Sequence, residues 1–222
     1  MPDAKALIEK IGRDLQPLEK KIRDHPYLHA MEEGKINRED LKIFVGEQLS
    51  IIPGDLKSIA FLISRLDRRE SQDFFRFVLQ GEAAALDALL TLGNALGMEP
   101  RERIAYEPKP GAQAYSAYLA WLCMFGADAE IAAALSVNFA AWGANCGRMG
   151  RALKARLGFN DEEITFFTKF AEAPSDPSPE ALVVIDAGLE AGVPERRIAR
   201  ACRMLQGYEL MFWDTVYEAF RA

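Results

Sequence analysis

A carboxylate near the C-terminus interrupts an apolar helical stripe. Glu209 lies where the helical period calls for an apolar side chain. Loss of hydration in such surroundings raises a carboxyl pKa toward the range that a general acid or base needs near neutral pH. A structural carboxylate held by another buried group would show the same pattern, so both interpretations stay open. Its neighbours at helical spacing are Cys202, Leu205, Phe212 and Val216, with Tyr208 and Trp213 alongside.

Two amides interrupt a second apolar stripe. Asn138 and Asn145 lie on the same face of the segment that begins at Asp128. Buried amides usually have specific hydrogen-bond partners, so these two either orient a ligand or tie helices together. The apolar members of this stripe are Ile131, Leu135, Phe139, Trp142, Cys146 and Met149.

A further carboxylate lies in the N-terminal third of the chain. Glu47 is four residues from both Ile43 and Ile51, with Gln48 and Ser50 beside it. It is either a second pocket carboxylate or a residue at the solvated edge of its helix.

Metal and disulfide chemistry are not indicated. His25 and His29 are the only histidines, and no further imidazole exists to complete a zinc or di-metal set. The cysteines Cys123, Cys146 and Cys202 lack CxxC spacing and each lies in an apolar helical pattern, which favours buried thiols. There is also no Gly-rich phosphate loop and no GxSxG motif.

The elements that must position these residues are helices. Apolar residues recur every three or four positions almost throughout, without the alternation of strands, so we predict an all-α protein. The expected helices span 3–23 (bent near Pro17), 26–33, 38–66 (interrupted near Pro53–Gly54), 70–97, 112–125, 128–157, 161–172, 178–191 and 195–220.

Capping residues and loop residues between these helices support the assignment. Asn37 is placed to cap the helix that follows it, with Asp40 in the first turn. The Pro/Ser-rich stretch at 171–181 is short and is followed at once by patterned helix, so it reads as a loop and not as a linker. We therefore expect one domain over residues 1–222.

Composition argues against nucleic acid and membranes as binding partners. The 27 Lys and Arg against 33 Asp and Glu give a net charge of −6, without the basic block that contact with nucleic acid requires. The N-terminus lacks a signal-peptide core, and no apolar run reaches the roughly 18 residues of a membrane span. We expect a cytoplasmic protein that binds neither nucleic acid nor membrane.

Three segments together resemble a known family. They are HisProTyrLeu at 25–28, AspLeuLysIlePheValGlyGluGln at 40–48 and TyrGluLeuMetPheTrpAspThrValTyr at 208–217. The chain resembles the TenA family of thiaminase II type proteins, which have a heme-oxygenase-like helical fold. The resemblance spans nearly the whole chain, and the C-terminal segment is its most specific part.

The resemblance implies a helical bundle around a central pocket, a homodimer or homotetramer, and no cofactor. It also implies a small aromatic heterocycle as ligand, since characterised members hydrolyse an aminopyrimidine with release of ammonia or cleave thiamin. In these enzymes a Cys attacks the pyrimidine ring, a Glu of the last helix moves protons, and an Asp with several Tyr residues binds the ring. A thiolate is well suited to add to a ring carbon beside a protonated nitrogen.

Carried over to this chain, the match is incomplete. Glu209 occupies the place of the catalytic Glu, Glu47 that of the ring-binding Asp, and Tyr115 that of a pocket Tyr, with Tyr118 as the alternative. In the segment 133–142, however, Asn138 stands where the family has its nucleophilic Cys. An amide can hydrogen-bond a ligand but cannot form the covalent adduct.

Further departures concern the walls of the pocket. Ser50 stands where another Tyr is usual, and Phe170 replaces a further one, while Trp142 and Tyr208 are additional candidates for ligand contact. Cys146, two turns beyond Asn138, is the one nearby thiol that could substitute as a nucleophile.

Two classes of function follow. The leading hypothesis is a divergent TenA-like enzyme acting on an aminopyrimidine or another small N-heterocycle, with Glu209 as general acid and base. The alternative is a non-catalytic ligand-binding, scaffold or regulatory protein of the same fold. Related branches include a cofactorless oxidase, which stays an alternative, and di-metal oxygenases. Glu82 could match a carboxylate of the di-metal branch, but the required histidines are missing.

Overall fold

The computed structural model describes residues 3–172 and 176–222, and every regular element in those ranges is a helix. The all-α prediction is confirmed. In chain order the helices are α1 Ala4–Arg23, α2 Pro26–Glu32, α3 Arg38–Ser64, α4 Arg69–Ala95, α5 Pro100–Ala105, α6 Pro110–Phe125, α7 Asp128–Leu157, α8 Thr165–Ala171, α9 Pro179–Glu190 and α10 Glu195–Arg221.

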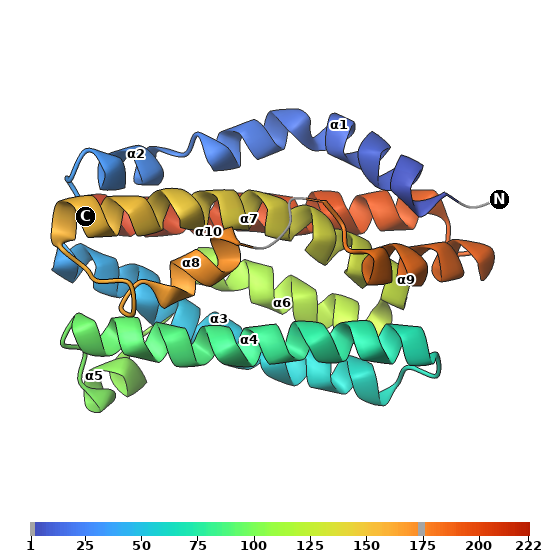
Figure 1. Ribbon diagram of the computed structural model, residues 1–222, viewed down its shortest axis with the longest axis horizontal. Helices are drawn as coiled ribbons and strands as arrows, with labels where there is room; N and C mark the ends of the chain where they lie inside the picture. Colours follow the sequence, from blue (N-terminus) through green and yellow to red (C-terminus); the bar gives the residue numbers. More distant parts are fainter. Residues whose placement is uncertain (1–2, 173–175) are drawn as a thin grey trace.

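The long helices run roughly along one direction in stacked layers (Figure 1). In that view α1 and α2 lie along one side, α7 and α10 run through the middle, and α3, α4 and α6 lie on the other side. Helix α10 packs against both α6 and α7, and α3 packs against both α4 and α6. Side chains from α3, α4, α6, α7 and α10 can therefore reach a common interior.

Helix α3 begins as its sequence predicts but does not stop at its proline. The side chain of Asn37 accepts hydrogen bonds from the backbone N–H groups of Glu39 and Asp40, at 2.8 and 3.0 Å, and Asp40 accepts from the N–H of Asn37 in return. The helix then continues through Pro53, where an interruption was expected. Proline costs a helix roughly 3 kcal/mol, and packing of α3 against two neighbouring helices offsets that cost.

Two short helices differ from the prediction. Helix α5 was not expected, because it buries no side chain and so leaves no apolar stripe in the sequence. Helix α8 begins at Thr165 and not at 161. Residues before it form a turn, in which Asn160 and Glu163 each accept the other's backbone N–H.

The interior consists of two apolar clusters that meet along α3, α6, α7 and α10. The first cluster is rich in aromatic rings and includes Tyr27, Phe44, Trp142, Phe166, Phe167, Phe212 and Trp213. The second cluster is mostly aliphatic and includes Leu7, Ile11, Phe75, Leu119, Ile131, Val184 and Leu205. Tyr115 of α6 packs against both clusters, so it marks the place where they meet.

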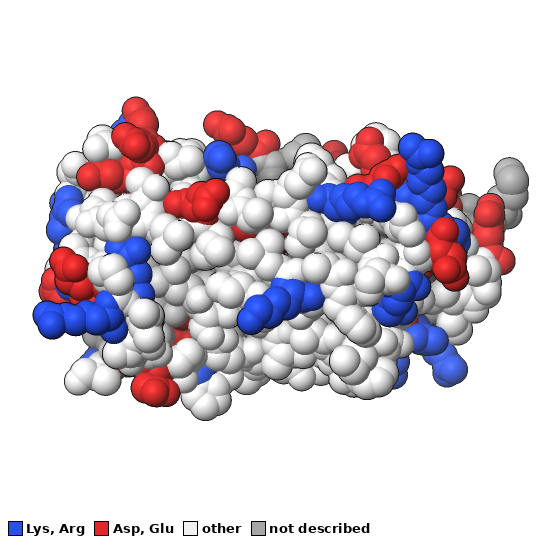
Figure 2. All heavy atoms as spheres, turned by 90° about the horizontal axis from the view of Figure 1, so that it is seen from below, with Lys and Arg blue, Asp and Glu red and all other residues white. Residues whose placement is uncertain are grey.

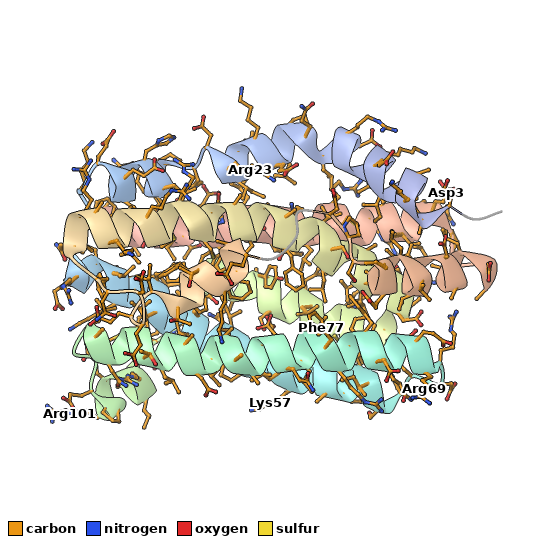
Figure 3. All side chains as sticks on the ribbon, in the orientation of Figure 1. Asp3, Arg23, Lys57, Arg69, Phe77 and Arg101 are labelled. Atoms are coloured by element: carbon orange, nitrogen blue, oxygen red, sulfur yellow. The ribbon has the colours of Figure 1, made fainter. Side chains whose placement is uncertain are left out.

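Most charged side chains lie on the outside, and the buried exceptions include Glu47, Asp55 and Glu209. On the face shown in Figure 2, acidic and basic residues are interspersed and the middle is mostly uncharged. Figure 3 shows Lys57, Arg69 and Arg101 on the outer side of the layer that holds α3, α4 and α5. Among the described helices, none has both the length and the apolar character needed to cross a membrane.

A glycine sets the distance between α7 and α9. A methyl group added at Gly188 would lie 2.2 Å from the Cβ of Ala129, which is far inside van der Waals contact. We expect Gly188→Ala to lower the free energy of unfolding by about 1–3 kcal/mol, measured by urea denaturation. Gly81 of α4 has open space around it, so Gly81→Ala should instead stabilise the protein by roughly 0.5–1 kcal/mol. Equal effects of the two substitutions would contradict the close packing of α7 on α9.

Candidate active site

Glu209 and Asn138 meet in the interior. Glu209 projects from α10 and is 2% exposed, and Asn138 projects from α7 and is 3% exposed. The Asn138 side-chain N–H donates to one carboxylate oxygen of Glu209 at 2.5 Å, and the indole N–H of Trp213 donates to the other at 3.1 Å. Both residues were singled out as polar interruptions of apolar stripes, and the structure brings them into direct contact.

Asn138 is the centre of a hydrogen-bonded chain across α6, α7 and α10. Its amide oxygen accepts from the hydroxyl of Tyr115 at 2.9 Å, and its amide nitrogen also donates to Gln206 at 3.1 Å. Burial raises the pKa of Tyr115, with a contribution from nearby carboxylates, so the phenol keeps its proton as a donor. These hydrogen bonds fix the orientation of the Asn138 amide and, through it, that of the Glu209 carboxyl group.

Burial raises the pKa of Glu209 to about 8, although the Trp213 and Asn138 donors act in the opposite direction. The cause is the loss of hydration of the charged form. At neutral pH this carboxyl is therefore mostly protonated and can donate a proton. Slightly above neutral pH it becomes a base.

A small cavity of about 40 Å³ adjoins this network. It has room for water molecules, whereas an engineered cavity that binds benzene measures roughly 150 Å³. Its apolar walls come mainly from aromatic rings, and its polar groups come from α3, α4, α6, α7 and α10. The lining residues are Gln48, Ile51, Ile52, Asp55, Glu82, Tyr115, Asn138, Phe139, Trp142, Phe170, Glu209 and Phe212.

The sequence analysis missed one carboxyl group of this cavity, Asp55, and considered another, Glu82, only as a ligand of a di-metal site. Asp55 of α3 is 3% exposed and accepts a hydrogen bond from Ser116 at 2.5 Å. Burial and the charge of Glu82 raise the pKa of Asp55, and burial raises the pKa of Glu82 to about 7. Asp55 lies four residues from both Ile51 and Ile59, which is the same stripe pattern that singled out Glu209.

Among the remaining candidates, Tyr115, Trp142 and Phe170 line the cavity together with Glu209 and Asn138. Trp142 packs edge-on against both Phe170 and Phe212, with ring centroids 6.0 and 5.7 Å apart. These edge-on contacts create an aromatic wall in the cavity that Glu209 also lines. Whether these side chains contact a ligand stays a prediction.

Glu47 lies elsewhere, contrary to the expectation that it belongs to the pocket. It is fully buried, and its carboxylate accepts hydrogen bonds from the Tyr106 hydroxyl at 2.8 Å, the Lys109 backbone N–H at 3.0 Å and the Gln113 amide at 2.9 Å. These partners lie in the segment that joins α5 to α6 and in the first turn of α6. Glu47 thus anchors that segment to α3.

Three other candidates are also not among the residues that line the cavity: Ser50, Tyr208 and Cys146. The ring of Tyr208 packs against Tyr118, with centroids 5.2 Å apart. Cys146 is fully buried, and burial together with the charge of Glu209 raises its pKa well above the usual value. A neutral, enclosed thiol is a poor nucleophile.

Each histidine contacts an aspartate. His25 contacts Asp214 at 3.1 Å, and His29 contacts Asp24 at 2.7 Å. In the part of the chain that the structure describes, no group of three or more His, Cys, Asp and Glu side chains is arranged to hold a metal ion.

A profile of the TENA/THI-4/PQQC family matches residues 13–219. The chain belongs to this family. Solved TenA-type structures share its fold: a TenA homolog from Pseudomonas syringae pv. tomato aligns with a TM-score of 0.80 at 14% identity, over 96% of this chain and 93% of that one. A TenA homologue from Pyrococcus furiosus aligns with a TM-score of 0.75 at 19% identity, over 95% of this chain and 100% of that one.

Two further solved structures share the fold. A protein from Shewanella denitrificans described as having a heme oxygenase-like fold aligns with a TM-score of 0.78 at 15% identity, over 96% of this chain and 93% of that one. A protein from Sulfolobus solfataricus described as a TenA-like thiaminase aligns with a TM-score of 0.68 at 12% identity, over 99% of this chain and 97% of that one. No curated protein matches the chain. The likeness to the Shewanella denitrificans structure confirms the predicted heme-oxygenase-like fold.

The anchoring role of Glu47 can be tested by stability. In Glu47→Ala the buried donors from Tyr106, Lys109 and Gln113 lose their acceptor, so we expect the free energy of unfolding to fall by at least about 2 kcal/mol in urea denaturation. Lys57→Ala, on the exposed side of the same helix, should change it by less than about 0.5 kcal/mol. A Glu47→Ala protein as stable as the wild type would contradict this role.

The raised pKa of Glu209 predicts a pH dependence of stability. The folded protein holds a proton there up to about pH 8, whereas the unfolded chain releases it near its ordinary pKa of 4.5. Stability therefore falls as the pH rises from about 5 to about 8. The pKa values of Asp55 and Glu82 are also raised, so these two groups contribute to the same fall in stability. Glu209→Gln should therefore remove only part of the fall, by more than about 1 kcal/mol. Urea denaturation at pH 5 and pH 8 gives the fall in the free energy of unfolding for each protein. An equal fall in the wild type and in Glu209→Gln would refute the raised pKa.

Proposed function

We propose that this protein is a TenA-type hydrolase that removes an amino group, as ammonia, from a thiamin-related aminopyrimidine or another small N-heterocycle. The observation that carries the proposal is the contact between Glu209 and Asn138 beside a cavity walled by aromatic rings. Aromatic walls suit a heteroaromatic ring, and the carboxyl group of Glu209 suits a ring nitrogen. Membership in the TENA/THI-4/PQQC family and likeness to a TenA-like thiaminase support this choice of substrate class.

Glu209 supplies the acid and base chemistry. In its protonated form it donates to a ring nitrogen, which makes the adjacent amine-bearing carbon electrophilic. The resulting carboxylate takes a proton from water as the water oxygen bonds to that carbon. Glu209 then passes this proton to the amino group, the carbon–nitrogen bond breaks, and ammonia leaves. Finally the carboxylate takes the hydroxyl proton as the ring carbonyl forms, which restores protonated Glu209.

Water is the nucleophile in this proposal because the cavity offers no thiol. Asn138 occupies the place that the family resemblance gives to Cys, and its amide hydrogen bonds orient Glu209 without bonding to the substrate carbon. Cys146 does not line the cavity. In this direct hydrolysis Glu209 alone must deprotonate the attacking water and protonate the leaving amino group.

Ammonia release from 4-amino-5-aminomethyl-2-methylpyrimidine tests the proposal. We expect Glu209→Gln to lower kcat/KM by at least about 100-fold, since general acid–base catalysis contributes roughly that factor or more. Cys146→Ser should stay within about threefold of the wild type, and circular dichroism checks that both variants fold. The kcat/KM profile should show a limb near pH 8 from Glu209. Absence of turnover by the wild type with this and related aminopyrimidines would exclude the hydrolase.

One observation favours a second function, a ligand-binding protein without catalysis. The polar groups of Asn138 and Glu209 satisfy each other and their neighbours within the protein. Such a network can be purely structural. A pyrimidine that raises the melting temperature without forming product would favour this function, because a ligand that binds only the folded state stabilises it.

The proposed assembly is a homodimer or homotetramer. Helix α6 carries Trp121, Met124 and Phe125 with 47, 53 and 62% of their surfaces exposed, and the rings of Trp121 and Phe125 are in contact, with centroids 5.8 Å apart. Exposed apolar side chains grouped in this way are typical of protein contact surfaces. They support an interface that includes α6.

A further inference from the structure

The side of the cavity formed by α3 and α4 holds polar groups that the proposed reaction does not use. Gln48 is 5% exposed, lines the cavity, and its side chain has no hydrogen-bond partner among the described residues. One carboxylate oxygen of Asp55 accepts a hydrogen bond from the Ser116 hydroxyl. The other oxygen has no hydrogen-bond partner among the residues that the structure describes. Both groups face a cavity that has room for water and not a protein partner, so they are free to bind a polar ligand there.

Glu82 of α4 strengthens this inference. It lines the same cavity as Asp55, and in the described ranges it forms neither a hydrogen bond nor an ion pair. The two carboxyl groups are close enough for the charge of Glu82 to act on Asp55. The residues that line the cavity include no Lys, Arg or His to neutralise them. The carboxyl pair therefore lacks the cation that would stabilise its charged form.

We propose that Asp55, Glu82 and Gln48 form a subsite for an ammonium group, so that the cavity selects an aromatic ligand with a primary amine arm. An ammonium group has three donors, which the free oxygens of Asp55 and Glu82 and the amide oxygen of Gln48 can accept. Its charge compensates the carboxylates, and the faces of Trp142 and Phe170 can add cation–π attraction. The assignment rests on the proposed cavity as the ligand site, and it does not require catalysis.

Benzylamine and benzyl alcohol form a matched pair of probes, because they share a ring and a size and differ in charge at pH 7. We expect isothermal titration or ligand-observed NMR to give benzylamine a Kd at least about tenfold lower than that of benzyl alcohol. Glu82→Gln should raise the Kd of benzylamine about tenfold and leave that of benzyl alcohol within twofold. Asp87→Asn, an exposed position on the same helix, should change neither.

Three outcomes would overturn the ammonium subsite: equal binding of the two probes by the wild type, no detectable binding of benzylamine, or an unchanged Kd of benzylamine in Glu82→Gln. Glu82→Gln replaces a partly exposed acid with a neutral amide of the same size, so folding should be preserved. If it is not, Asp55→Asn gives the same comparison.

The result is independent of the hydrolase assay. If benzylamine binds through Glu82 but no aminopyrimidine releases ammonia, the subsite stands and the proposed hydrolase fails. If ammonia is released but the two probes bind equally, the hydrolase stands and the ammonium subsite is wrong.

Discussion

The burial of Glu209 is the constraint on which the rest of the site depends. A carboxyl group with 2% of its surface exposed has lost its hydration, and that loss must be offset by donors held in place by other helices. Trp213 supplies one donor from the same helix, and Asn138 supplies the other from α7. Tyr115 of α6 holds Asn138 in turn. The relative positions of α6, α7 and α10 are therefore coupled to the position of the two carboxylate oxygens of Glu209.

Glu209 and Asn138 could be found from the sequence alone. A polar residue in a long apolar stripe is visible without knowledge of its partners, and both Glu209 and Asn138 interrupt such stripes. The helix assignment, the Asn37 cap and the family resemblance depend on local or contiguous signals of the same kind. The fold was therefore predictable in outline from the chain alone.

The rest of the site depends on neighbours that spacing does not specify. Glu47 and Asp55 both lie on α3, and each has isoleucines four residues away. Glu47 faces donors that lie 59 to 66 residues along the chain, whereas Asp55 faces the cavity. Nothing local distinguishes them. The continuation of α3 through Pro53 has a similar origin, because the packing that offsets the proline is supplied by distant helices.

The small volume of the cavity has a kinetic consequence. The proposed ring ligand needs more space than about 40 Å³, so it could enter only when part of the wall has moved aside. Phe139 and Phe170 are less deeply buried than Trp142 and Phe212, which makes them the side chains that yield most readily. The apparent affinity is then reduced by the fraction of molecules in the open arrangement, and association is slower than diffusional encounter. Once the wall has closed again, a bound ring is also slow to escape.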